Sequence, residues 1–158
     1  MKKELELKLV KNYSQLLKDH DGDPKVTGLA WGMECGDGWY YIIDEALHLI
    51  NQVCIKFEHE DIAVAQIKEK YGQLRIYMTY GECSNDVVCK IIECITEAAL
   101  QKSRSCCELT GKYGVLCKRG SWVKTLSFEA AQDCLHEYEP ANEYDKANWE
   151  QRKKKLQV

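Results

Sequence analysis

The sequence predicts an α+β fold, in which helices pack around a central antiparallel β-hairpin and a small strand pair follows it. Three observations predict this class. Apolar residues recur at helical spacing in the N-terminal part, the period changes to alternation between residues 62 and 80, and helical spacing returns after residue 85. Because the 158 residues contain no internal repeat and no linker-like stretch, we expect a single domain over residues 1–158.

The helical N-terminal part is predicted over residues 1–58. Its first helix has an apolar face over Leu5–Leu17 and ends at the turn-forming segment D-H-D-G-D-P that follows. A glycine-rich segment, T-G-L-A-W-G-M-E-C-G-D-G-W, occupies residues 27–39. Asp37 is a candidate N-cap for a second helix, whose apolar face extends over Ile42–Phe57.

The hairpin is predicted over residues 62–80, with alternating apolar and polar side chains and a turn near Tyr71–Gly72. Three further parts are expected after it: a helix over 85–104 capped by Ser84 or Asn85, ribbon-like strands within 106–127, and C-terminal helices over 128–157. The first of these C-terminal helices should reach Tyr138 and end before Pro140, because the residue before a proline disfavours helical backbone.

Composition limits the class of protein. The chain is 45% apolar and 30% charged, as globular proteins are, and its formal net charge of -3 gives no reason for non-specific attraction to nucleic acid or to an anionic membrane. It shows neither a signal-peptide pattern nor a long apolar run, so we expect a cytoplasmic protein without a membrane partner. Its nine cysteines include no C-x-x-C pair and often lie in apolar segments, which indicates reduced, buried thiols.

Three segments carry a family resemblance. They are W-G-M-E-C-G-D-G-W at 31–39, I-K-E-K-Y-G-Q-L-R-I-Y at 67–77, and C-E-L-T-G at 107–111 with W-V-K-T-L-S at 122–127. In this order they resemble a group of small, largely uncharacterised proteins of tailed phages and prophages, over roughly residues 12 to 131. The resemblance implies a phage or mobile-element origin, and then a location in the host cell cytoplasm, but no activity.

The last segment of that family looks like a four-ligand zinc ribbon. By this resemblance Cys107 stands at the first ligand position, while Thr110, Ser127 and Ala130 stand at the other positions. Hydroxyls are poor zinc ligands and alanine is none, so we expect a degenerate ribbon that holds no metal. One alternative stays open, a replacement metal site drawn from Cys106, Cys107, Cys117, Cys134 and His136.

Candidate binding residues lie in the glycine-rich segment: Trp31, Glu34, Cys35, Asp37 and Trp39. Glycines allow close approach of a partner or ligand, and tryptophan is a frequent contact residue. A structural interpretation competes with this one, in which both tryptophans fill the core. Cys35 would need a neighbouring base to act as a nucleophile, and the spacing of the sequence supplies none.

Two basic regions offer further candidates. The hairpin carries Tyr71 and Arg75 beside other lysines and tyrosines, and the second strand pair carries Lys118 and Arg119. Glu108 is the one acid between residues 101 and 128, whereas acids dominate the segment from 129 to 150. Either these two segments pack together and neutralise each other, or the basic strand pair contacts a partner.

The function predicted from these observations is that of a non-catalytic phage or mobile-element accessory protein that binds a macromolecular partner. A host protein, including one of host defence, is the expected class of partner. Two alternatives are a nucleic-acid-binding protein that uses the basic strand pair and hairpin, and a binder of a small nucleotide-like ligand in the glycine-rich segment. We expect no cofactor. Catalysis stays open but is not favoured, since the sequence lacks Walker, G-x-G-x-x-G and H-E-x-x-H patterns.

Overall fold

The computed structural model describes residues 1–81, 86–133 and 138–156, and it confirms the predicted α+β class. The helices are α1 (Lys3–Asn12), α2 (Tyr40–Lys56), α3 (Asp86–Ser103), α4 (Phe128–Asp133) and α5 (Glu143–Leu156), with 3₁₀ turns η1 (Gly28–Trp31) and η2 (Asp37–Trp39). The strands are β1 (Ala63–Lys70), β2 (Gln73–Thr79), β3 (Val115–Arg119), β4 (Trp122–Leu126) and β5 (Glu139–Pro140). In the described parts of the chain, no helix has both the length and the apolar character needed to cross a membrane.

The hairpin β1–β2 lies where alternation predicts it. Its strands pair antiparallel with Ile67 opposite Ile76, and its turn consists of Tyr71 (φ 54°) and Gly72 (φ 75°). Positive φ at both turn residues is the requirement of a type I′ turn, whose twist matches that of the two strands. The side chains therefore alternate between an inward and an outward row, except where a β-bulge between Val64 and Gln66 shifts the register of β1.

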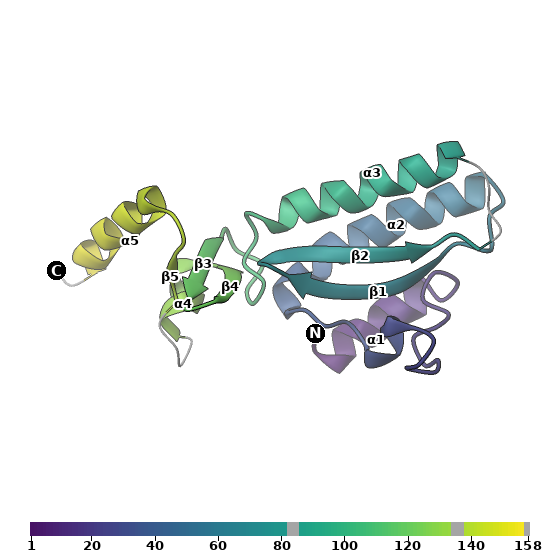
Figure 1. The fold of residues 1–158 in the computed structure, drawn as a ribbon, viewed down its shortest axis with the longest axis horizontal. Coiled ribbons are helices and arrows are strands. Elements are labelled where there is room, and N and C mark those ends of the chain that lie inside the picture. Colours follow the sequence, from purple (N-terminus) through teal and green to yellow (C-terminus); the bar gives the residue numbers. More distant parts are fainter. Residues whose placement is uncertain (82–85, 134–137, 157–158) are drawn as a thin grey trace.

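Helices cover one face of the hairpin. The inward side chains, which include Val64, Ile67 and Leu74, are buried in the larger hydrophobic cluster with residues of α1, α2 and α3. Figure 1 shows α2 and α3 side by side, with α1 lower and β1–β2 in front of α2. No helix among the described residues lies in front of the strands in that view. The opposite face of the hairpin is therefore open.

The first helix is shorter than predicted. It ends at Asn12, although Leu16 and Leu17 beyond it are buried as expected. Tertiary hydrogen bonds explain the early end. The Tyr13 hydroxyl donates to Asp44 Oδ1 at 2.8 Å, and the Leu16 carbonyl accepts the Val64 N–H at 2.8 Å, so this backbone serves β1 instead of continuing a helix.

The second sheet has the strand order β4-β3-β5 and belongs to a separate hydrophobic cluster with α4 and α5. Its strand pair was predicted, but β5 was not: Glu139–Pro140 pairs with β3, and Tyr138 is not helical, so the predicted helix from 128 to 138 is wrong at its C-terminal end. Proline fits an edge strand because it lacks an N–H for a further neighbour. Figure 1 places this sheet and α5 at the opposite end of the molecule from the start of α3.

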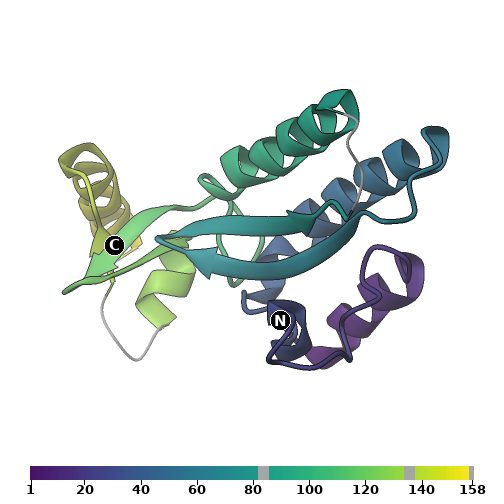
Figure 2. The ribbon, with the colours of Figure 1, turned by 45° about the vertical axis from the view of Figure 1, so that its right-hand side comes forward.

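The hairpin tip joins the two parts of the molecule. The Thr125 hydroxyl on β4 donates to the Gly72 carbonyl at 2.7 Å, and a side chain at position 72 would meet Leu116 Cδ1 at 2.4 Å. Figure 2 shows the narrow end of β1–β2 reaching the second sheet. Glycine at position 72 thus serves both the turn and this close contact.

Candidate functional site

The glycine-rich segment is attached to the edge of the hairpin. Glu34 pairs with Lys68 of β1 as an isolated parallel bridge. The Glu34 N–H donates to the Ile67 carbonyl at 3.0 Å, and the Glu69 N–H donates to the Glu34 carbonyl at 2.9 Å. Gln66 adds a side-chain bond to Glu34 Oε2 at 2.8 Å. The segment therefore forms one continuous surface with the open face of the hairpin.

Its two tryptophans have opposite environments. Trp39 is fully buried, and its indole N–H donates to the Cys106 carbonyl at 2.8 Å. Trp31 is 70% exposed at the end of η1. That turn is fixed, because Thr27 Oγ1 accepts the Leu29 N–H and the Leu29 carbonyl accepts the Gly32 N–H at 2.8 Å. Trp39 thus fills the core, and Trp31 is available to a partner.

Two other candidate residues of this segment, Cys35 and Asp37, have structural roles. The Cys35 thiol is buried, and burial raises its pKa to about 12, so it is protonated at neutral pH and unsuited to nucleophilic attack. Asp37 does not cap α2, which has no side-chain cap. Instead Asp37 Oδ1 accepts the Lys2 N–H at 2.7 Å, immediately before α1. The predicted cap is therefore wrong, since this carboxylate serves a different helix.

The glycines of the segment are used by the protein itself. The Gly38 N–H donates to the Glu108 carbonyl at 2.8 Å, and a side chain at position 38 would lie 2.2 Å from the Cys107 carbonyl oxygen. At Gly36 the same substitution would meet the Glu108 carbonyl oxygen at 2.3 Å. The backbone of the turn at 107–111 therefore lies directly against these glycines. It occupies the space that the sequence analysis offered to a partner or ligand.

Glu108 holds this junction together. Its carboxylate is buried, and its two oxygens accept the Gly36 N–H at 3.0 Å and Lys124 Nζ at 2.7 Å. The lysine belongs to β4, so one side chain joins the glycine-rich segment to the second sheet. Burial lowers the pKa of Lys124, but the bond and charge of Glu108 outweigh burial and raise it overall.

The positions predicted for a degenerate ribbon gather around Cys107. This thiol is buried, and burial raises its pKa, but hydrogen bonds from the Thr110 hydroxyl and from the N–H groups of Ser127, Thr110 and Leu109 lower it overall. Ser127 Oγ accepts the Ala130 N–H at 3.2 Å. The structure therefore brings all of these positions into one hydrogen-bonded turn region.

No three His, Cys, Asp or Glu side chains in the described parts of the chain are grouped so that they could hold a metal ion. Of the residues predicted for a replacement metal site, Cys107 and Cys117 are buried and Cys106 is half-buried. Cys134 and His136 lie outside the described residues, as do the predicted caps Ser84 and Asn85.

The open face of the hairpin carries cations beside aromatic rings. The register places Lys68 opposite Arg75 on this face. Lys68 Nζ lies 5.4 Å from the centroid of the Tyr77 ring, and Lys70 Nζ lies 5.7 Å from that of Tyr71 at the tip. Arg75 donates to Gln73 Oε1 at 3.0 Å. We call this surface, together with Trp31 and Glu34, the hairpin face.

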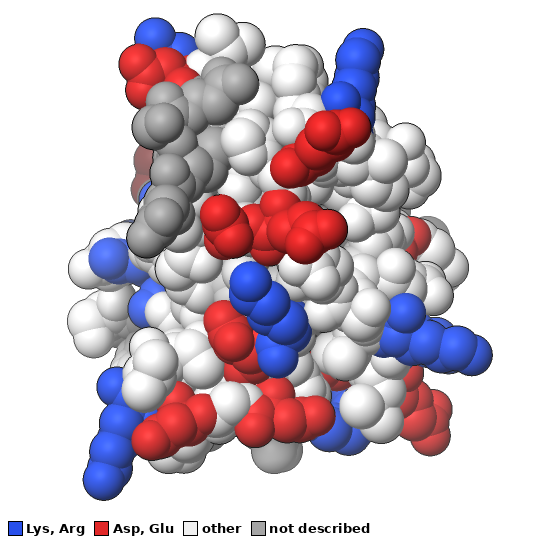
Figure 3. Space-filling view, turned by 90° about the vertical axis from the view of Figure 1, so that its right-hand side faces the viewer, with Lys and Arg blue, Asp and Glu red and all other residues white. Residues whose placement is uncertain are grey.

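Lys118 and Arg119 lie on β3, away from that face. The Arg119 guanidinium stacks on the Tyr138 ring, 5.3 Å from its centroid. Lys118 is directly opposite Glu139 of β5 in the register. Part of the acidic segment thus packs beside the basic strand, but the ion pair of Glu139 is with Lys146 of α5, so the neutralisation of β3 stays a prediction. At the end of the molecule where α2 ends and α3 begins, Figure 3 shows acidic and basic side chains intermixed, without a large patch of one sign.

Sequence reasoning missed a buried cluster around Glu6. One carboxylate oxygen lies 2.8 Å from both Lys3 Nζ and His20 Nε2, and the other accepts the Met33 N–H at 2.9 Å. The cluster fixes the middle of the glycine-rich segment, at Met33, against α1. A charged residue on the apolar face of the first helix was the available signal, because a buried carboxylate requires partners.

Comparison with models of known protein families found no match, and comparisons with curated proteins and with solved structures found none either. The resemblance to the phage family therefore stays a prediction.

Proposed function

We propose that this protein is a non-catalytic accessory protein that binds a protein partner through the hairpin face, with Trp31 as its anchor. The observation that carries the proposal is the 70% exposure of Trp31 on a hydrogen-bonded turn. Tryptophan, tyrosine and arginine dominate the energetics of protein interfaces, and a rigid anchor loses little conformational freedom on binding. Tyr71, Tyr77 and Arg75 belong to the same hairpin face and are residue types suited to the contacts around such an anchor.

The phage or mobile-element origin belongs to this proposal through the sequence resemblance alone. A phage accessory protein would act in the host cytoplasm, where reduced thiols such as those of Cys35 and Cys107 persist. Its partner would then be a host protein, with defence machinery as the class that small phage proteins often occupy. This step is an analogy from family to function.

A pull-down from host lysate tests the proposal. We expect one stoichiometric partner with the wild type and its loss with Trp31→Ala. Trp122→Ala is the matched control, since Trp122 is 69% exposed but lies on β4. Retention of the partner by both variants, or its loss from both, would contradict an anchor at Trp31.

Nucleic-acid binding is the second candidate, favoured by the lysines placed over tyrosine rings on the hairpin face. Single strands bind to such surfaces through base stacking and phosphate contacts. We expect, under this candidate, an affinity for labelled single-stranded oligonucleotides that falls steeply with salt and weakens in Lys68→Gln. Affinity that does not change with salt would exclude it.

A further inference from the structure

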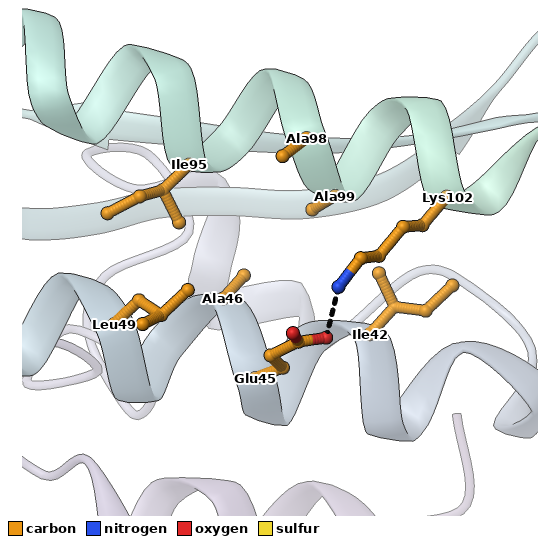
Figure 4. A pocket seen from close by; sticks show the side chains of 8 residues that line it. All are labelled: Ile42, Glu45, Ala46, Leu49, Ile95, Ala98, Ala99 and Lys102. Carbon is orange, nitrogen blue, oxygen red and sulfur yellow. Dashed lines mark hydrogen bonds and ion pairs between the residues drawn. The ribbon is translucent and has the colours of Figure 1, made fainter.

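The outward side of the α2–α3 pair contains an apolar groove. A cavity of ≈ 450 Å³ there is lined by Leu49 of α2 and by an apolar row of α3. Leu49 is 45% exposed and Val87 is 62% exposed. Figure 4 shows the adjoining hollow between α2 and α3, which shares Leu49, Ile95 and Ala98 with the groove and is crossed by the ion pair of Lys102 with Glu45; the hairpin strands lie behind the helices. The groove therefore faces away from the hairpin face.

The apolar residues on the outward side of α3, of which Ile91 is half-buried, follow a coiled-coil spacing. Val87, Ile91, Cys94 and Ala98 are spaced by four, three and four residues, which is the spacing of an apolar seam between two helices. All of them line the cavity. The core side of the same helix uses a different row, with Val88, Ile92 and Ala99 buried. Thus α3 has one apolar row facing the core and a second one facing solvent.

The charges beside this row are complementary between two antiparallel copies of α3. Lys90 and Glu97 lie two helical turns apart on the same side of the row. An antiparallel copy of α3, with Ile91 of one copy packed against Cys94 of the other, puts Lys90 of each copy opposite Glu97 of the other. A parallel copy would instead put Lys90 beside Ile95 of the other copy, without an opposite charge, and Glu97 beside Lys102, which already pairs with Glu45. The pattern therefore fits an antiparallel second copy of this chain, in which Lys90 and Glu97 of both copies gain an opposite charge.

We propose that the protein forms a two-fold symmetric dimer through α3, with the exposed row of each copy packed in the groove of the other. Closed two-fold contacts are the commonest form of homo-oligomer, and each residue pair then occurs twice. The hairpin faces stay free and point away from each other, so the dimer does not depend on the proposed function.

Sedimentation across a dilution series of the full chain tests the dimer. The wild type should approach twice the mass of 18.2 kDa as concentration rises. Lys90→Glu alone and Glu97→Lys alone should each weaken self-association by about tenfold or more, because each opposes like charges twice. The double variant Lys90→Glu with Glu97→Lys should restore it.

Glu93→Lys is the matched control, an exposed acid on the same helix that lies off the seam and should leave the dimer intact. Thermal unfolding of each variant establishes that it is folded. A wild type that stays monomeric at every concentration overturns the proposal. A dimer that both single reversals leave unchanged, or that the double variant fails to restore, overturns it as well.

Discussion

At the scale of residues, two buried carboxylates organise the segments around the candidate site. Glu6 fixes the middle of the glycine-rich segment to α1 at Met33, and Glu108 joins the later part of the segment to Lys124 of the second sheet. Removing one partner of a buried, hydrogen-bonded charge leaves the rest desolvated and unpaired, which costs more than the original interaction contributes. These residues support the hairpin face without contacting solvent themselves.

Glu6 should make stability depend on pH in the acid range. Its burial alone would raise its pKa, but hydrogen bonds from Lys3, the Met33 N–H and His20 hold the pKa down, from 4.5 to about 2. A depressed folded-state pKa gives stability that is present above pH 4.5 and lost as pH falls toward 2. Once Glu6 is fully protonated, the free energy of unfolding should be lower by about 3 kcal/mol.

Denaturant unfolding of the wild type and Glu6→Gln at several pH values tests this. The variant should be less stable at neutral pH and should have a flatter pH dependence between 4.5 and 2. Glu4→Gln, an exposed neighbour on the same helix, should keep the wild-type slope. Equal slopes in all three proteins would mean that Glu6 is not responsible.

The sequence named both Trp31 and Trp39 as candidate binding residues but could not tell which of them is exposed. Trp31 and Trp39 lie in 3₁₀ turns and connecting backbone, where no helical or strand period distinguishes inward from outward. Burial of Trp39 depends on the Cys106 carbonyl, which is distant in sequence. For the same reason Glu108 looked like an isolated acid in a basic segment, while Gly36 and Lys124 are its partners.

At the scale of elements, predictions succeeded where a local pattern decides the structure. Alternation predicted β1 and β2 nearly to their ends, and helical spacing predicted α3. The predictions failed where a hydrogen bond between distant parts of the chain determines where an element ends. The carbonyl of Leu16 pairs with β1, so α1 ends early, and Glu139 joins β3, so no helix reaches Tyr138.

The junction between the glycine-rich segment and the turn at 107–111 should tolerate no side chain. We expect Gly38→Ala to lower the free energy of unfolding by about 3 kcal/mol or more, because its Cβ would lie 2.2 Å from the Cys107 carbonyl oxygen. Gly120→Ala is the control. That position has φ +58° but open space around it, so only the backbone strain of about 1–2 kcal/mol applies. Similar losses in both variants, measured by chemical denaturation, would argue against a tight junction.

At the scale of the whole molecule, the two hydrophobic clusters should respond separately to mutation. Trp149 of α5 packs edge-on against Phe128, with ring centroids 5.3 Å apart. Trp149→Ala should therefore lower the free energy of unfolding of the smaller cluster by about 3 kcal/mol. Hydrogen exchange should accelerate in β3 and β4 but not in β1 and β2, because the hairpin belongs to the larger cluster.

Tyr144→Ala supplies the comparison, since Tyr144 is 77% exposed on the same helix and should change neither sheet. Acceleration across both sheets in Trp149→Ala would instead mean that the clusters unfold together.

The hairpin face is the surface to which we assign the proposed function. The most direct test is the affinity of the purified partner, once captured, for the wild type, Trp31→Ala and Trp122→Ala by calorimetry. Loss of a central anchor costs about 2 kcal/mol or more, which is roughly thirtyfold in Kd. We predict that loss for Trp31→Ala alone. Unchanged affinity in Trp31→Ala, or an equal loss in Trp122→Ala, would contradict it.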